Sequence, residues 1–289
     1  MKPAPFRYLA PDSLAAALEL KAQHGDDARF LAGGQSLIPA MNFRLAQPAV
    51  LIDLNPLREL DYIRAAGDGR LAIGALTRNR ALERDAVVAA QQPLVHEAVP
   101  HVAHPQIRNR GTVGGNLAHA DPASELPAVM LALGARLRAR SARGERWIEA
   151  RDFFTGVFST ALRQDELLVE VELPRLPPRT GTAFLEVARR HGDYAMMGVA
   201  AVVTLGDDGT CTDARLAYCN AGATPVLGKR AAQALAGQRV ADSHIAAAAA
   251  AGREIDPPGN VHASKAFQRH LAGVLTRRAV RTALARATR

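Results

Sequence analysis

The sequence has 289 residues, of which 48% are hydrophobic and 22% are charged, and its formal net charge is +8. This length and composition exclude a disordered chain and allow two compact domains, each with its own core. The positive charge comes mainly from arginines spread along the chain, and with 4 Tyr and 1 Trp there are few side chains for bases to stack on, so we expect no nucleic acid partner.

The same features bear on partners and location. A dispersed basic surface pairs with acidic partner subunits or keeps a protein in solution. No stretch approaches the length of a transmembrane helix, and the N-terminal sequence MKPAPFRYLAPDS has no apolar segment of signal-peptide type. We therefore expect a cytoplasmic protein with no membrane span.

The first 56 residues predict a small α/β lobe. Asp12 and Ser13 can cap a helix, and Gly25 can end it. The expected elements are a helix over 14–22, a short strand at 30–31, a helical segment over 36–46 that contains a proline, and a buried strand over 50–54.

Residues 57–176 predict a second lobe. A Gly-Asp-Gly turn at 67–69 lies between two short apolar segments and favours a hairpin. After it we expect helices over 77–90, 93–102 and 126–133, and strands over 136–139, 145–148 and 167–173.

A proline-rich linker, LPRLPPRTG at 173–181, separates this lobe from the rest of the chain. Beyond it we expect strands over 182–188, 199–205 and 214–219, then helices over 231–235 and 243–251 and an amphipathic terminal helix. Cys211 and Cys219 have neither the spacing of a metal site nor the number of a disulfide framework. We expect buried thiols, and no iron–sulfur cluster on this chain's own cysteines.

Two short stretches concentrate glycines: AGGQS at 32–36 and TVGGN at 112–116. Glycine-rich turns can direct several backbone N–H groups at an anion, and Ser, Thr and Asn side chains can add hydrogen bonds. Neither stretch is a P-loop or a Rossmann fingerprint. Ordinary tight turns are one interpretation, and a pair of turns that hold the diphosphate of a dinucleotide is the other.

Longer segments around these turns carry a resemblance. The sequence AGGQSLIPAMNFRLAQP at 32–48 and the sequence IRNRGTVGGNLAHADPASELP at 107–127 resemble the two FAD-binding motifs of the medium subunit of molybdenum hydroxylases. This family includes carbon monoxide dehydrogenase and xanthine dehydrogenase. The segments 153–174 and 188–205 also match its pattern in order and spacing. The chain is thus similar to this family over nearly its whole length.

The resemblance implies an α+β fold in two parts. Residues 1–176 would form a two-lobed FAD-binding domain of the vanillyl-alcohol-oxidase/PCMH type, with lobes of about 1–56 and 57–176. Residues 177–289 would form the C-terminal domain of the carbon monoxide dehydrogenase flavoprotein type, a small α+β unit whose helices pack on a three-stranded antiparallel sheet.

The resemblance also implies the cofactor site. The FAD diphosphate and ribityl chain would be held, largely by backbone N–H groups, at Ala32, Gly33, Gly34, Gln35, Ser36, Thr112, Val113, Gly114, Gly115 and Asn116. Gln35 stands where many relatives have His. No His or Cys is placed for a covalent flavin link, so we expect non-covalent FAD.

Three further residues match family positions near the flavin. Glu125 would contact ribityl hydroxyls, although a solvated carboxylate at a helix start is the alternative. Leu168 would line the flavin or lie in a core strand. Tyr194 would lie beside the isoalloxazine or in an exposed loop. We expect no catalytic protein residue and no bound metal, because the family's chemistry occurs on the flavin.

The implied function is electron transfer within a larger oxidoreductase. A large subunit would hold the molybdenum cofactor and a small subunit the [2Fe–2S] clusters, in a dimer of heterotrimers, and this chain's FAD would pass electrons to an external acceptor. The substrate of the complex and the acceptor (quinone, NAD or oxygen) lie outside this sequence.

Two other hypotheses remain open from the residues. A free-standing FAD-dependent oxidase would need a substrate domain with a catalytic base, which residues 180–289 do not display. A non-enzymatic basic protein would bind nucleic acid in a salt-dependent way and would carry no flavin.

Overall fold

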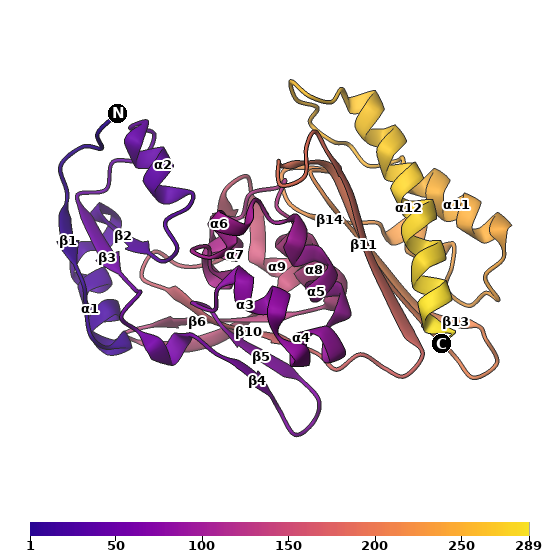
Figure 1. Ribbon diagram of the computed structural model, residues 1–289, viewed down its shortest axis with the longest axis horizontal. Helices are drawn as coiled ribbons and strands as arrows, with labels where there is room; N and C mark the ends of the chain where they lie inside the picture. The colour runs from indigo at the N-terminus through magenta and orange to yellow at the C-terminus, as the bar shows by residue number, and fades with distance from the viewer. Residues whose placement is uncertain (289) are drawn as a thin grey trace.

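Three groups of strands and helices follow one another along the chain in the computed structural model, which describes residues 1–288. Figure 1 shows them side by side: a small N-terminal lobe, a larger middle lobe, and a C-terminal domain that ends in a long helix. The apolar side chains form three buried clusters, one of which spans the middle lobe and one face of the C-terminal sheet. The site lies where these groups meet.

The N-terminal lobe is a three-stranded parallel sheet in the order β1-β3-β2. Its elements are β1 (Arg7–Leu9), α1 (Leu14–His24), β2 (Ala28–Leu31), α2 (Leu37–Asn42) and β3 (Val50–Asp53), with short 3₁₀ turns η1 (Gly25–Asp27) and η2 (Arg58–Leu60). The sequence VLID of β3 is buried at every position, as expected for a central parallel strand. The side chain of Ser13 accepts a hydrogen bond from Ala16 and caps α1, as its sequence predicts.

The middle lobe is a five-stranded antiparallel sheet, in the order β4-β5-β10-β6-β7, with helices packed on one face (Figure 1). Its strands are β4 (Ile63–Ala65), β5 (Leu71–Gly74), β6 (Arg136–Ser141), β7 (Gly144–Glu149) and β10 (Leu167–Leu173); a separate hairpin consists of β8 (Phe154–Gly156) and β9 (Ser159–Thr160). Its helices are α3 (Asn79–Arg84), α4 (Ala86–Gln91), α5 (Pro93–Ala98), η3 (Val99–His101), α6 (Pro105–Arg108), α7 (Val113–His119), α8 (Glu125–Leu133) and α9 (Ala150–Phe153). The expected hairpin around residues 67–69 is present as β4 and β5.

The helix expected over 77–90 is wrong as a single element. It is divided into α3 and α4 at Asp85, which is extended and whose carboxylate accepts hydrogen bonds from the N–H groups of Val87 and Val88 at 2.8 and 3.0 Å. An Asp that satisfies two N–H groups of a new first turn favours a second helix start over continuation.

The C-terminal domain contains the three expected antiparallel strands, β11 (Thr180–Ala188), β12 (Ala195–Leu205) and β13 (Cys211–Cys219). The expectation of three strands needs one correction: a short fourth strand, β14 (Val226–Leu227), pairs with β13. Three helices follow: α10 (Lys229–Gln233), α11 (Asp242–Gly252) and α12 (Lys265–Ala287). Both cysteines are free and buried, as expected.

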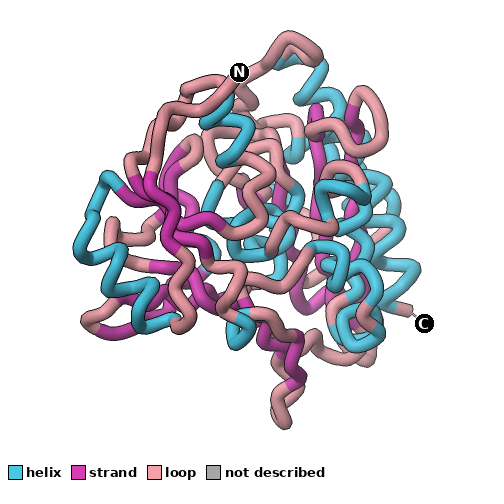
Figure 2. The backbone as a smooth tube through the Cα atoms, turned by 60° about the vertical axis from the view of Figure 1, so that its left-hand side comes forward, coloured by secondary structure: helices cyan, strands magenta, loops and turns pink. Residues whose placement is uncertain are grey.

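Helices cover both faces of this C-terminal sheet. The helices α10, α11 and α12 pack on one face, and α5 and α8 of the middle lobe pack on the other. Figure 2, turned by 60° from Figure 1, shows helices on either side of these strands. The strand β12 is accordingly buried at almost every position, which explains its nearly continuous apolar sequence, AMMGVAAVVTL.

Candidate functional site

The two glycine-rich stretches are in direct backbone contact although eighty residues separate them. A Cβ added at Gly33 would lie 2.3 Å from the carbonyl oxygen of Arg110 and 2.8 Å from the Cα of Gly111. Only glycine therefore allows the turn after β2 to pack on the segment that leads into α7. This contact places both stretches on one surface.

The second stretch is the start of a helix, whereas both interpretations of the sequence took it for a turn. Thr112 is the N-cap of α7, and its Oγ1 accepts a hydrogen bond from the N–H of Gly115 at 3.0 Å. A Cβ added at Gly114 would lie 2.5 Å from the Cβ of Ala75, so this glycine lets α7 pack closely on the end of β5. Glycines 33 and 114 thus serve the approach of backbone to backbone.

The first stretch leaves hydrogen-bond donors free. Within residues 1–288 the backbone N–H groups of Gly34, Gln35, Ser36 and Leu37 donate to no protein acceptor. Gly34 has φ +73°, a left-handed conformation that lets the turn form. Free N–H groups at consecutive positions of a turn are suited to an anion.

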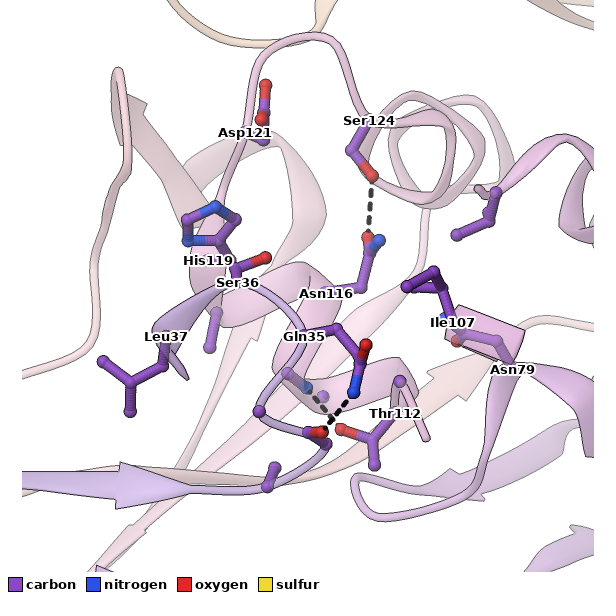
Figure 3. A pocket seen from close by; sticks show the side chains of 18 of the residues that line it. Gln35, Ser36, Leu37, Asn79, Ile107, Thr112, Asn116, His119, Asp121 and Ser124 are labelled. Carbon is purple, nitrogen blue, oxygen red and sulfur yellow. Dashed lines mark hydrogen bonds between the residues drawn. The ribbon is translucent and has the colours of Figure 1, made fainter. Parts of the chain in front are cut away.

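Polar side chains extend this surface. Gln35 donates to the carbonyl oxygen of Gly33 at 3.1 Å, and the hydroxyl of Ser124 donates to the Oδ1 of Asn116 at 2.9 Å. Figure 3 shows Gln35, Thr112 and Asn116 close together in the wall of the cavity, although they come from the two separate stretches. The amide group of Asn116 is left to donate.

A cavity of about 680 Å³ runs along this surface between the lobes. All but one of the predicted site residues line it: Ala32, Gly33, Gly34, Gln35, Ser36, Thr112, Gly114, Gly115, Asn116, Glu125, Leu168 and Tyr194. Val113 is the exception, because its side chain is fully buried in the core of the middle lobe. A smaller cavity, of about 390 Å³, adjoins the turn at Gly33 and Gly34 and is also lined by Tyr8 and Arg110.

Glu125 is buried, so the alternative of a solvated carboxylate at a helix start is wrong. It is the first residue of α8 and only 4% exposed. Burial, and then the nearby charge of Glu186, raise the pKa of Glu125 to about 8. A buried carboxyl group on a cavity wall is therefore uncharged over much of the neutral range.

Leu168 and Tyr194 differ in exposure. Leu168 is buried in β10, beside an irregularity in its pairing with β6, so it belongs to the core as well as to the cavity wall. Tyr194 lies in the loop between β11 and β12, is 66% exposed, and also lines the cavity. Leu168 thus lies in a core strand and Tyr194 in an exposed loop, and both line the cavity; their contact with the flavin stays a prediction.

Sequence reasoning missed several residues of the cavity wall. Asn79 is buried, and its Oδ1 has no hydrogen-bond partner within residues 1–288. The ring of His119 lies 4.9 Å from that of Phe158, and burial lowers the pKa of this histidine. Phe158 has φ +52°, a conformation rare for a residue with a side chain, and the turn sequence gave no signal of it.

His104 packs against Gly192. A Cβ added at Gly192 would lie 2.4 Å from the Nδ1 of this histidine. The ring therefore helps to fix the loop that carries Tyr194. His191 lies with its ring 5.7 Å from that of His101.

Comparison with known families identifies the family of the chain. Residues 4–176 match the family described as the FAD binding domain in molybdopterin dehydrogenase. The chain belongs to that family. A second match follows it: residues 182–283 match the family described as the CO dehydrogenase flavoprotein C-terminal domain.

Individual relatives agree over the full length. The chain is 44% identical to the 6-hydroxypseudooxynicotine dehydrogenase complex subunit alpha of Paenarthrobacter nicotinovorans, across 99% of this chain and 97% of that protein. It is 38% identical to the carbon monoxide dehydrogenase medium chain of Afipia carboxidovorans, across 99% of each. The solved structure of carbon monoxide dehydrogenase from Hydrogenophaga pseudoflava, in a form that lacks the Mo-pyranopterin moiety, superposes with a TM-score of 0.96 at 37% identity and 99% coverage of both chains. The resemblance seen in the sequence, and the α+β fold that it implied, are confirmed.

The residues of the cavity fit FAD, the cofactor of this family. A volume of about 680 Å³ is within the usual range for cofactor sites. The free N–H groups at 34–37 are suited to a diphosphate, and the unpaired Oδ1 of Asn79 and the amide of Asn116 offer polar contacts. No helix within residues 1–288 has the length and apolarity needed to cross a membrane.

Proposed function

We propose that this chain binds FAD non-covalently in the cavity between its lobes and serves as the electron-transfer subunit of a molybdenum-containing hydroxylase or dehydrogenase. The observation that supports this most directly is the backbone contact between Gly33 and Arg110, which brings both FAD motifs to one cavity. Membership of the FAD-binding family over residues 4–176 agrees with it.

Each part of the site has a role in this proposal. The N–H groups at 34–37 bind the diphosphate, with the helix start at 112–116 beside them, and Glu125 and Asn116 bind the ribityl hydroxyls. Leu168 and Tyr194 lie against the ring system. Bound FAD would supply one- and two-electron redox chemistry, and the protein would bind it, orient it and limit its contact with water.

The proposal extends to the assembly. Relatives are named as a subunit of a dehydrogenase complex and as a medium chain, which supports a partner arrangement of the same kind. A large subunit would hold the molybdenum cofactor and a small subunit the [2Fe–2S] clusters, as a dimer of heterotrimers in the cytoplasm. Electrons from the clusters would pass through this chain's FAD to quinone, NAD or oxygen.

We propose that residues 1–176 form the FAD-binding domain and residues 177–289 the C-terminal domain. The two family matches support this division, because they end and begin at residues 176 and 182. The irregular segment between β10 and β11 lies at the same place.

The visible absorption spectrum of the purified chain, before and after denaturation, tests the cofactor. Flavin bands that are released as free FAD on denaturation are the expected result. A colourless protein that binds added FAD would support the same site, completed in the cell by partner subunits. A colourless protein that takes up no FAD would contradict the proposal.

A further inference from the structure

A buried group of acidic side chains lies behind the wall of the cavity, at the contact between α8 and the C-terminal sheet. Glu125 of α8 lines the cavity. Glu186 of β11 has a side chain only 3% exposed, and its Oε2 is buried and has no hydrogen-bond partner within residues 1–288. The thiol of Cys219 on β13 is fully buried, and the charges of both glutamates help to raise its pKa, after burial itself.

The two glutamates share this environment but have different partners. The Oε1 of Glu186 lies 3.2 Å from the Nδ1 of His101 in η3, whose side chain is 29% exposed. Glu125 has no such basic partner: the charged groups that act on it are Glu186 and Asp121, and both are acidic. Glu186 and Cys219 both pair with Gly198 across the sheet, and α8 packs on β12 and β13, so both glutamates belong to one buried cluster. Two buried carboxyl groups in one cluster are not both charged at low cost.

The other titratable groups around Glu125 are neutral or add negative charge. They are Asp121 in the loop before α8, Tyr194 in the loop between β11 and β12, and Cys219 on β13. His119 on α7 lines the same cavity, and burial lowers its pKa. None of them stabilises a carboxylate at Glu125. Burial and these negative charges raise the pKa of Glu125 to about 8, against the opposing effect of hydrogen bonds from its own backbone N–H and from Ser124.

We propose that Glu125 binds the cofactor as an uncharged carboxylic acid, and that Glu186 is the positioning residue that keeps it in this form. The inference rests on the proposed FAD site and adds a property of it. A protonated Glu125 can donate a hydrogen bond to a ligand oxygen, whereas a carboxylate can only accept.

This protonation state makes cofactor affinity depend on pH. FAD displaces water from the cavity and brings the negative charge of its diphosphate, and both effects disfavour a charged Glu125. Binding therefore raises the pKa of Glu125 above its value in the free protein. Above pH 8 a proton must be taken up when FAD binds, so the affinity falls as the pH rises, by about tenfold between pH 7 and pH 9.

The test measures FAD binding to the full chain, freed of cofactor, by flavin fluorescence between pH 6 and pH 9. The FAD affinity of the wild-type chain is expected to fall above pH 8. Glu125→Gln, which is uncharged at every pH, is expected to bind without this dependence. Glu186→Gln removes the neighbouring negative charge and so lowers the pKa of Glu125. The fall in FAD affinity is therefore expected to begin at a lower pH than in wild type. Glu145→Gln, a change in the exposed strand β7, is the matched control and should follow wild type.

Two direct readouts of the proton complete the test. Calorimetry in buffers of different ionisation enthalpy should show almost no proton uptake on FAD binding at pH 7, and uptake approaching one proton at pH 9, absent in Glu125→Gln. The infrared carbonyl band of a protonated carboxylic acid at pH 7, lost in Glu125→Gln, reports the same group without FAD.

The outcomes separate the two claims. If FAD binds equally well at pH 7 and pH 9 in wild type, or if Glu186→Gln leaves the pH profile unchanged, the inference is wrong while the FAD site stands. If no FAD binds at any pH, the proposed function fails. In that case the infrared band still reports whether Glu125 is protonated at pH 7. Its absence would show that the inference about the protonation of Glu125 is wrong too.

Discussion

At the scale of single residues, the site depends on where a Cβ is absent. Gly33 sits against the backbone of Arg110 and Gly111, so even a methyl group must separate the two halves of the cavity. The obstacle is backbone, which cannot rotate away as a flexible side chain can. This glycine therefore fixes the distance between the two FAD motifs.

We expect Gly33→Ala to weaken FAD binding by at least about tenfold and to lower the free energy of unfolding by about 1–3 kcal/mol, because the added Cβ overpacks a backbone contact. Flavin fluorescence titration and urea unfolding measure the two effects. Gly67→Ala is the matched control, since nothing lies within 4 Å of a Cβ added in that hairpin turn. Wild-type FAD affinity in Gly33→Ala would show that the spacing of the two motifs does not matter for binding.

At the scale of elements, α7 shows why part of the site could not be read from the sequence. Two adjacent glycines disfavour a helix by about 1 kcal/mol each, so TVGGN was interpreted as a turn. The helix forms because Thr112 caps it and because Gly114 allows close packing on Ala75, a contact between segments far apart in sequence. The motif was visible in the sequence, but its conformation depended on its tertiary neighbour.

Other elements divide in the same way. The hairpin at 67–69, the cap of α1 by Ser13 and the buried strand β3 follow local signals and were predicted. The short strand β14 pairs by two residues only and carries no periodic pattern, so it was missed. The burial of Glu125 was also missed, because α8 packs on strands of the C-terminal sheet that lie far along the chain.

The cap of α7 gives a prediction at this scale. Thr112→Ala should lower the free energy of unfolding by about 0.5–2 kcal/mol, because the N–H of Gly115 loses its acceptor. It should also weaken FAD binding, since this first turn forms part of the cavity wall. Urea unfolding and FAD titration of the same samples measure both.

Two variants make this interpretable. Thr112→Ser keeps the hydroxyl and should restore most of both properties. Ser13→Ala removes the cap of α1, away from the cavity, and should lower stability while leaving FAD affinity unchanged. If Thr112→Ala and Ser13→Ala affect FAD binding equally, the cap of α7 has no particular role in the site.

At the scale of the whole molecule, the proline-rich linker separates two domains along the chain, but their buried cores are continuous. Side chains of β11, β12 and β13, among them Phe184 and Cys219, belong to the same buried cluster as the helices of the middle lobe. An interface this apolar favours one rigid unit over two mobile domains. The continuous apolar sequence of β12 was the one sign in the sequence that both faces of this sheet are covered. In a strand covered on one face only, apolar and polar residues would alternate.

Arg286, near the end of the last helix, joins the two parts at the edge of this interface. Its guanidinium donates to the Oε2 of Glu97 in α5 at 2.7 Å and to the carbonyl oxygen of Thr182 in β11 at 2.6 Å. The Oε2 of Glu97 also accepts from the N–H of Phe184 at 3.2 Å. One arginine thus holds a helix, a strand and the neighbouring domain together.

We expect Arg286→Ala to lower the free energy of unfolding by about 1 kcal/mol, a modest amount because the pair is partly exposed, and to leave FAD affinity unchanged because the residue is remote from the cavity. Arg281→Ala breaks a more exposed pair with Asp242 inside the C-terminal domain and should cost less than about 0.5 kcal/mol. Equal losses of stability in the two variants, measured by urea unfolding, would mean that the link between α12 and α5 contributes no more than an ordinary surface pair. A larger loss in Arg286→Ala would show that the C-terminal helix helps to hold β11 against α5 of the FAD-binding lobe.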